Sequence, residues 1–376
     1  MTGWLMRPRH GSAWTSLSRN RRQCTASRPF QRLNGRWNMA DTIELDTMDS
    51  GAYDRRSERA TLARDNLSLT SDLKQLSHWR QALQIGVQWA VIVAAVTLAE
   101  VSDSTLVCLI AVVVIATRQH ALLVLMHDAA HLLISRDKRR NDLISNVFLT
   151  FPLTLSTSRY RAHHIAHHKH LNTPDDPDYA DAFAPASSGL FWQALLRDIS
   201  GLSTLQSLRT MDSFSVIGLF THPVPSTRIE RYQAMAFYAC AALLITALQA
   251  WPAVLLYWLA PLVFFLPPIL RIRSLSEHAG LSTQSVKRDA RSVSPGWLER
   301  GLFAPCNINR HWEHHLFQQI PSYHLGTLSR RLAQSLPGSA AACSTQGYLL
   351  GERSMRAELY GANGRARAVA SLDQEA

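Results

Sequence analysis

Four long apolar runs constrain the fold of this chain more than any other feature. They cover approximately residues 81–99, 104–126, 232–251 and 253–270. Each run is close to the roughly 20 residues that a helix needs to cross the hydrocarbon core of a bilayer. Because the runs come in two closely spaced pairs, we predict two helical hairpins. The predicted fold class is therefore an all-α integral membrane protein with four transmembrane helices.

The charges around these runs predict their orientation. The turns at 100–104 and 251–252 carry no Lys or Arg, whereas the outer flanks of both hairpins are basic, at Lys74, Arg80, Arg136, Lys138, Arg139, Arg140, Arg228, Arg231, Arg271 and Arg273. The positive-inside rule then places both termini in the cytoplasm. The apolar stretch 143–155 is too short to span comfortably and contains Pro152. We expect it to lie at the interface or to be re-entrant.

The net charge of +11 does not indicate a nucleic-acid partner. Eight arginines and no acidic residue lie in residues 1–40, and without them the net charge falls to +3. This Arg- and Ser-rich segment resembles an organellar transit peptide, or precedes a later start at Met39 or Met48. We expect residues 1–60 to be disordered, residues 61–335 to form the membrane domain, and residues 336–376 to form a cytoplasmic tail.

Three clusters hold ten of the 16 histidines. They read HDAAH at 127–131, HHIAHHKH at 163–170 and HWEHH at 311–315. Residues three and four apart share a face of a helix, and neutral imidazole is a common ligand of transition metals. All three clusters fall on the predicted cytoplasmic side. We therefore predict a histidine-rich metal site in a cytoplasmic helical cap. The five scattered cysteines form no Cys-x-x-Cys pair, which argues against zinc ribbons and iron–sulfur clusters.

The order HDxxH, HxxHH, HxxHH, interleaved with two hairpins, resembles the membrane fatty acid desaturase superfamily over about residues 85–335. Members of that superfamily hold two iron ions on histidines from the three boxes. They use one further histidine after the last span, which here implies His278. The implied ligands are His127, His131, His164, His167, His168, His278, His311, His314 and His315. His163 and His170 are the nearest residues that the pattern does not include.

Other polar residues near the boxes are candidates to orient the ligand imidazoles through the outer ring nitrogen. They are His120, Asp128, Asp175, Asp178, Glu277, Asn307, Asn309 and Glu313. A solvated acid, a helix cap or an ordinary polar residue is an equally good interpretation of each one. Gln318-Gln319 departs from the family pattern, where many relatives have proline. We place it outside the ligand set and expect no effect on metal binding.

The resemblance implies a reaction that consumes O2 and two external electrons and that desaturates or hydroxylates carbon. The sequence carries no flavin, haem or iron–sulfur motif. The electrons are therefore expected from a separate reductase or a ferredoxin-like donor at the cytoplasmic face. The basic residues 136–140 are a candidate docking patch for an acidic donor, or an anchor to anionic headgroups.

The stretches EHAG at 277–280 and PCNINRH at 305–311 are similar to a bacterial branch that includes the rhizobitoxine desaturase. An acyl chain is the first expected substrate. The alternative is a small dihydrorhizobitoxine-like amino acid, and hydroxylation at the same site comes third. The bacterial inner membrane is the expected location. A metal transporter would need ionisable residues within its spans, and these spans contain almost none. A zinc metalloprotease would need HExxH, which is absent.

Overall fold

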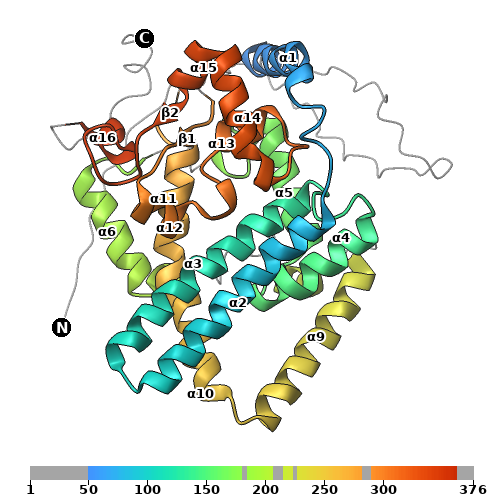
Figure 1. Ribbon diagram of the computed structural model, residues 1–376, viewed down its shortest axis with the longest axis vertical. Coiled ribbons are helices and arrows are strands. Elements are labelled where there is room, and N and C mark those ends of the chain that lie inside the picture. Colours follow the sequence, from blue (N-terminus) through green and yellow to red (C-terminus); the bar gives the residue numbers. More distant parts are fainter. Residues whose placement is uncertain (1–49, 180–183, 206–214, 223–226, 282–288, 362–376) are drawn as a thin grey trace, which may run out of the picture. The chain divides into compact units, whose positions relative to one another are not determined.

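The computed structural model describes residues 50–179, 184–205, 215–222, 227–281 and 289–361. Residues 48–376 form one compact unit, and residues 1–47 lie outside the described part of the chain. The described part of this unit is mostly helical (Figure 1). Its α-helices are α1 (Ser50–Asp65), α2 (His78–Ser102), α3 (Thr105–Ala130), α4 (Lys138–Ser145), α5 (Thr157–His170), α6 (Ser188–Ile199), α8 (Val216–Thr221), α9 (Arg228–Ala247), α10 (Trp251–Val254), α11 (Leu266–His278), α12 (Trp297–Phe303), α13 (His311–Leu316), α14 (Ser322–Ser335), α15 (Pro337–Ala342) and α16 (Met355–Tyr360).

Shorter elements connect these helices. The π-helical stretches are η2 (Asn146–Thr150), η6 (Leu255–Leu259) and η7 (Pro261–Phe265), and the 3-10 turns are η1 (Leu67–Leu69), η3 (Phe151–Leu153) and η9 (Pro305–Asn307). The strands β1 (Ser292–Val293) and β2 (Ser344–Thr345) pair in parallel, with Ser292 opposite Ser344.

Three of the described helices are long and apolar enough to cross a membrane. They are α2, α3 and the continuous helix Trp251–His278, which joins α10, η6, η7 and α11. They correspond to three of the four predicted runs. The fourth run falls on α9, whose first turn carries Arg228, Glu230 and Arg231. Its apolar part from Tyr232 to Ala247 is about 24 Å long at 1.5 Å per residue, so a fourth span stays a prediction.

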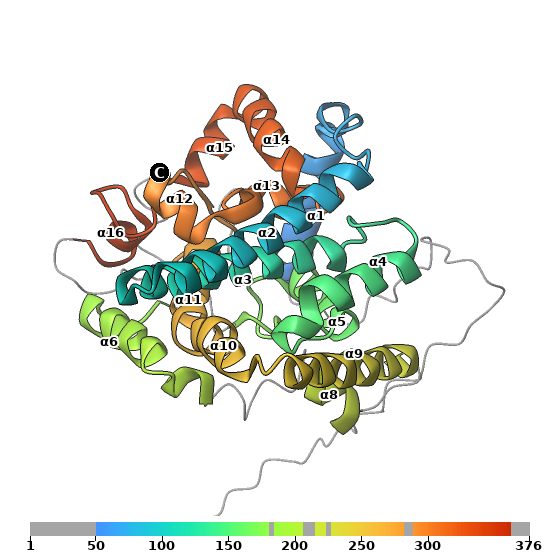
Figure 2. The ribbon, with the colours of Figure 1, turned by 60° about the horizontal axis from the view of Figure 1, so that its bottom comes forward.

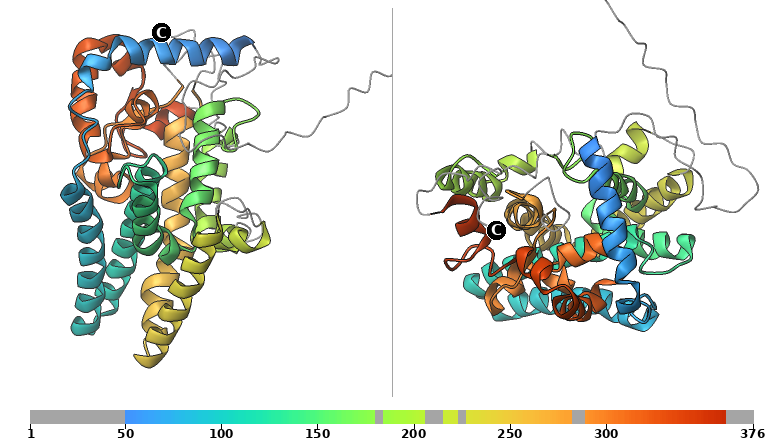
Figure 3. Two further views of the ribbon diagram at one scale, coloured as in Figure 1. Left: turned by 90° about the vertical axis from the view of Figure 1, so that its right-hand side faces the viewer. Right: turned by 90° about the horizontal axis from the view of Figure 1, so that it is seen from above.

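The membrane helices differ in how much of their surface the protein covers. Helix α3 is buried on nearly all sides from Ala111 to Ala130, because α2, α5, α11 and η9 pack around it. Helix α2 instead exposes an apolar side that includes Trp79, Val93 and Leu98. Figure 3 (left) shows the long helices extending away from a cap formed by α1 and the C-terminal helices. An apolar exposed side suits contact with lipid rather than water.

The cap includes two segments that the sequence analysis did not place in a folded domain. Helix α1 covers residues 50–65, so part of the segment expected to be disordered is helical. Residues 336–361 do not form a separate tail. Strand β2 pairs with β1, and the side chains of Tyr348, Met355 and Tyr360 are buried against α11 and α12. The apolar residues of this C-terminal segment are too widely spaced to reveal that packing from the sequence.

Helix α6 adds a further layer beside α11 (Figure 2). Its side chains Phe191 and Leu195 are buried, and Arg271 of α11 donates hydrogen bonds to the carboxylate of Asp198. Asp198 is only 1% exposed. The ion pair therefore fixes α6 against α11.

The carboxylate of Glu299 fastens the C-terminal segment to α12. It accepts backbone N–H bonds from Tyr348, Leu349 and Leu350 at 3.0, 2.8 and 3.1 Å. Hydrogen bonds to a charged group contribute about 1.5–3 kcal/mol. We expect Glu299→Gln to lower the thermal midpoint of the detergent-solubilised protein by a few degrees. The exposed Glu352→Gln, which makes the same charge change, is expected to melt as wild type. Equal melting of both variants would contradict this anchoring role.

Candidate metal centre

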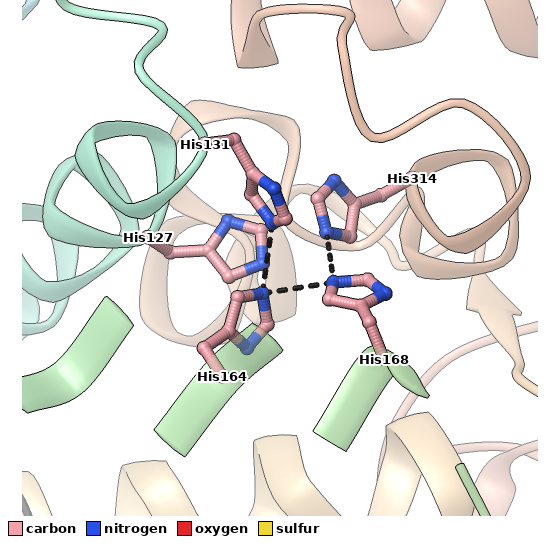
Figure 4. A group of neighbouring side chains, drawn as sticks. All are labelled: His127, His131, His164, His168 and His314. Atoms are coloured by element: carbon pink, nitrogen blue, oxygen red, sulfur yellow. Dashed lines mark hydrogen bonds between the residues drawn. The ribbon is translucent and has the colours of Figure 1, made fainter. Parts of the chain in front are cut away.

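Nine histidines meet where the ends of α3, α5, α11 and α13 come together. Their ring nitrogens form two groups, within each of which the nitrogens lie within 4.8 Å of one another. The first histidine group is His127, His131, His164, His168 and His314 (Figure 4). The second histidine group is His167, His278, His311 and His315. The structure thus brings together all nine histidines that the resemblance implied as ligands.

Helical spacing explains how two elements serve both groups. On α5, His164 and His168 are four residues apart and face the first group, while His167 turns toward the second. On α13, His311 and His315 face the second group and His314 faces the first. The two groups are adjacent, because the ring centroids of His168 and His315 lie 4.3 Å apart. The doubled histidines of the second and third clusters therefore separate into two neighbouring sites.

The distances between nitrogens suit a transition metal. In the first group, Nε2 of His164 lies 3.0 Å from Nε2 of His131 and 2.9 Å from Nε2 of His168. In the second, Nε2 of His311 lies 2.9 Å from the Nε2 atoms of both His278 and His315. Two nitrogens held at right angles around an ion at about 2.1 Å would lie about 3.0 Å apart. The donor set and its spacing therefore fit metal binding.

Burial keeps most of these imidazoles in the neutral form that binds metal. Eight of the nine are buried, and His131 is half-buried. Burial, aided by the charge on Arg161, lowers the pKa of His131 to about 3. Burial also lowers the pKa of His164, His168, His311, His314 and His315 well below the usual value. The buried Nε2 of His127 has no hydrogen-bond partner among the described residues, as expected of an atom placed to bind an ion.

Comparison with known proteins agrees with this geometry. Residues 103–347, well over half of the chain, match the family model of fatty acid desaturases. The chain belongs to the fatty acid desaturase family. It is also similar to the dihydrorhizobitoxine desaturase of Bradyrhizobium elkanii, with 27% identity over 296 residues, which cover 73% of this chain and 83% of that protein. The chain is therefore an oxidoreductase of this family.

In this desaturase, acidic side chains lie beside the outer nitrogens of two histidines in the second group. Nδ1 of His167 lies 2.9 Å from Oδ1 of Asp176 and 3.6 Å from Oδ2 of Asp178. Nδ1 of His311 lies 3.5 Å from Oε1 of Glu277. Although burial opposes protonation of His167, the hydrogen bond with Asp176 and the charges of Asp178 and Glu277 raise its pKa overall. Only Asp176 is hydrogen-bonded to an outer nitrogen, and Nδ1 of His311 has no hydrogen-bond partner among the described residues. A role of Asp178 and Glu277 in orienting the imidazoles stays a prediction.

The sequence interpretation did not identify Asp176 and Gln318, which both lie beside histidines of the two groups. Asp176 is buried, whereas Asp175, which the sequence interpretation chose instead, is exposed. The turn after α5 directs only one of these adjacent carboxylates inward, and that choice depends on loop geometry. Nε2 of Gln318 lies 2.9 Å from Nδ1 of His168. Gln318 is thus outside the two histidine groups but contacts one member of the first group. That it leaves metal binding unaffected stays a prediction.

The other polar candidates form hydrogen bonds with the backbone or with a serine side chain rather than with the imidazoles. Asp128 accepts a hydrogen bond from the backbone N–H of Ser322 at 3.1 Å, and Asn307 donates to the carbonyl of Ser322 at 3.0 Å. Asn309 donates to the carbonyl of Val293 at 2.8 Å, and Glu313 accepts from Ser292 Oγ.

Three histidines near the site lie outside both groups. His120 is fully buried on α3, and neither of its ring nitrogens has a partner among the described residues. His163 and His170 also belong to neither group. Nε2 of His163 lies 2.7 Å from Oδ1 of Asp178.

The hydrogen bond between His167 and Asp176 predicts that Asp176 supports metal binding by His167. Loss of an outer partner of a ligand histidine usually costs about 10–100-fold in metal affinity. We expect Asp176→Asn to lose iron to a competing chelator about 10–100-fold more readily than wild type. Asp175→Asn, which changes the exposed neighbour, is the matched control and should retain iron. Equal retention by both variants would show that Asp176 does not support the site.

Proposed function

We propose that this desaturase binds two non-haem iron ions, one in each histidine group, and uses O2 to remove two hydrogen atoms from its substrate. The observation that supports this proposal is the presence of two adjacent, buried groups of four and five mostly neutral imidazoles. With iron bound, O2 supplies an oxidant strong enough to attack an unactivated C–H bond. The substrate loses two hydrogens, and O2 is reduced to two waters with two external electrons and two protons.

The role of the protein is to hold neutral ligands in place and to exclude water. Helices α3, α5, α11 and α13 hold the imidazoles, and Asp176 and Gln318 hydrogen-bond to the rings of His167 and His168 from outside. Rigid placement and a dry surrounding are what a metal-based oxidation needs from its protein.

The electrons would come from an external donor. Arg136, Lys138, Arg139 and Arg140 are all exposed, at the start of α4. They form a basic patch that suits an acidic, ferredoxin-like donor or anionic headgroups. We further propose that α9 is the fourth span, which places both termini and the histidines on the cytoplasmic side of a bacterial inner membrane.

Two substrate classes fit this reaction. An acyl chain, the first expectation from the sequence, is supported by an apolar cavity of about 960 Å³ between α2, η2, α9 and η6. Its lining includes Trp89, Phe148, Tyr238 and Trp258. A small specialised metabolite is the second candidate, because the similar protein is named for its action on dihydrorhizobitoxine.

The proposal is tested by product analysis. The chain is expressed with a ferredoxin and its reductase, and lipids and polar metabolites are compared by mass spectrometry with and without O2. We expect an O2-dependent product two mass units lighter than its precursor. A product that is 16 units heavier would identify a hydroxylase instead. Product that forms equally without O2 would contradict the proposal.

A further inference from the structure

A second, much smaller pocket lies directly beside the histidines. Its volume is about 170 Å³, and it lies between α5 and α11. Four of the nine histidines line it, namely His164, His167, His278 and His311, so it contacts both histidine groups. By contrast, none of the nine histidines lines the apolar cavity of about 960 Å³. The small pocket is therefore the better placed of the two to present carbon to the metal centre.

The size of this pocket limits what it can hold. A cavity of about 150 Å³ in a protein core accommodates one benzene molecule, whereas pockets for drug-sized ligands are about 300–1,000 Å³. A pocket of about 170 Å³ thus admits a compound or fragment of roughly benzene size. A complete long acyl chain does not fit in it.

One guanidinium, that of Arg273, lines the pocket beside the carboxylates of Glu277 and Asp178. Nε of Arg273 donates to Oε1 of Glu277 at 2.8 Å, and the Arg273 side chain is 13% exposed. Its two Nη atoms have no hydrogen-bond acceptor among the residues that the structure describes. The other acid lining the pocket, Asp178, is paired with His163 at 2.7 Å. The unused Nη pair has the planar, forked arrangement that binds a carboxylate through two parallel bonds.

We propose that Arg273 binds a carboxylate of the substrate, and that the carbons which lose hydrogen lie within a few bonds of that carboxylate. The substrate class is then a small carboxylate-bearing metabolite rather than the middle of a long acyl chain. This inference rests on the proposed function and selects between its two substrate classes. Glu277 holds the guanidinium from its Nε side and leaves the Nη side to the ligand.

Binding of a fluorinated carboxylate to the full, iron-loaded chain tests the inference. The probe is 4,4,4-trifluorobutyrate, followed by fluorine NMR, and its uncharged amide is the matched control ligand. We expect the carboxylate to bind wild type at least tenfold more tightly than the amide. Arg273→Gln should weaken carboxylate binding at least tenfold, and Arg330→Gln, on the exposed side of α14, should not change it. Equal binding of acid and amide, or full carboxylate binding by Arg273→Gln, would overturn the inference.

Three further measurements keep these outcomes interpretable. If Arg273→Gln fails to fold, Ser274→Phe, which fills the pocket while retaining Arg273, should abolish probe binding; undiminished binding would overturn the inference. Octanoate should displace the probe no better than butyrate, and a large gain with chain length would point to the apolar cavity instead. Iron content is measured on the same samples. If the iron-loaded protein does not bind the carboxylate, this inference alone is rejected. If the protein does not bind iron, the proposed function is rejected.

Discussion

Replacing His315 by alanine is expected to abolish turnover and to lower the iron content from about two ions per chain to about one. His315 is 1% exposed, and its Nε2 lies 2.9 Å from Nε2 of His311 in the second histidine group. The variant leaves that group with three imidazoles. Loss of an outer partner of a ligand histidine alone lowers metal affinity about 10–100-fold. Loss of the ligand itself should therefore lower the affinity for iron more than about 100-fold. Product formation and elemental analysis of the purified protein measure both effects.

His324→Ala is the control for this variant. His324 lies on α14, against the ring of Tyr323 at 4.7 Å and outside both histidine groups. It should retain iron and turnover. Normal turnover by His315→Ala, with two iron ions still bound, would remove His315 from the ligand set.

His278→Ala is expected to have an effect of similar size. His278 ends α11, and its Nε2 lies 2.9 Å from Nε2 of His311. It is the one member of the nine that lies outside the three clusters of the sequence. We expect the variant to bind about one iron ion per chain and to lose turnover more than about 100-fold.

The matched control for His278→Ala is His222→Ala, which changes an exposed histidine outside both groups. An unchanged iron content in His278→Ala would reject its role as a ligand. A loss of iron in both variants would instead indicate a general effect on the protein.

The grouping of the nine histidines could be predicted from the sequence because the pattern behind it is local. Spacings of three and four residues place His164 and His168 together on α5, and His311 and His315 together on α13. That periodicity is a property of the helix itself and needs no knowledge of packing. Three of the four apolar runs likewise became helices long enough to span a membrane.

The features that the sequence did not reveal depend on long-range packing. Asp176 rather than Asp175 faces His167, because the turn after α5 buries only one of the two. Gln318 meets His168 across 150 positions of the chain. The folding of residues 336–361 onto α11 and α12 depends on single contacts such as those of Glu299, which leave no periodic pattern. The substrate class was open for the same reason, since residues from α5 and α11 jointly line the small pocket.

The metal content of the wild-type chain tests the central claim most directly. The full-length protein is purified from iron-supplied cells, and iron, zinc, manganese and copper are quantified per chain by inductively coupled plasma mass spectrometry. Two iron ions per chain, with the other metals far below one, is the predicted result. A single ion per chain, or zinc in place of iron, would contradict a di-iron centre built from the two histidine groups.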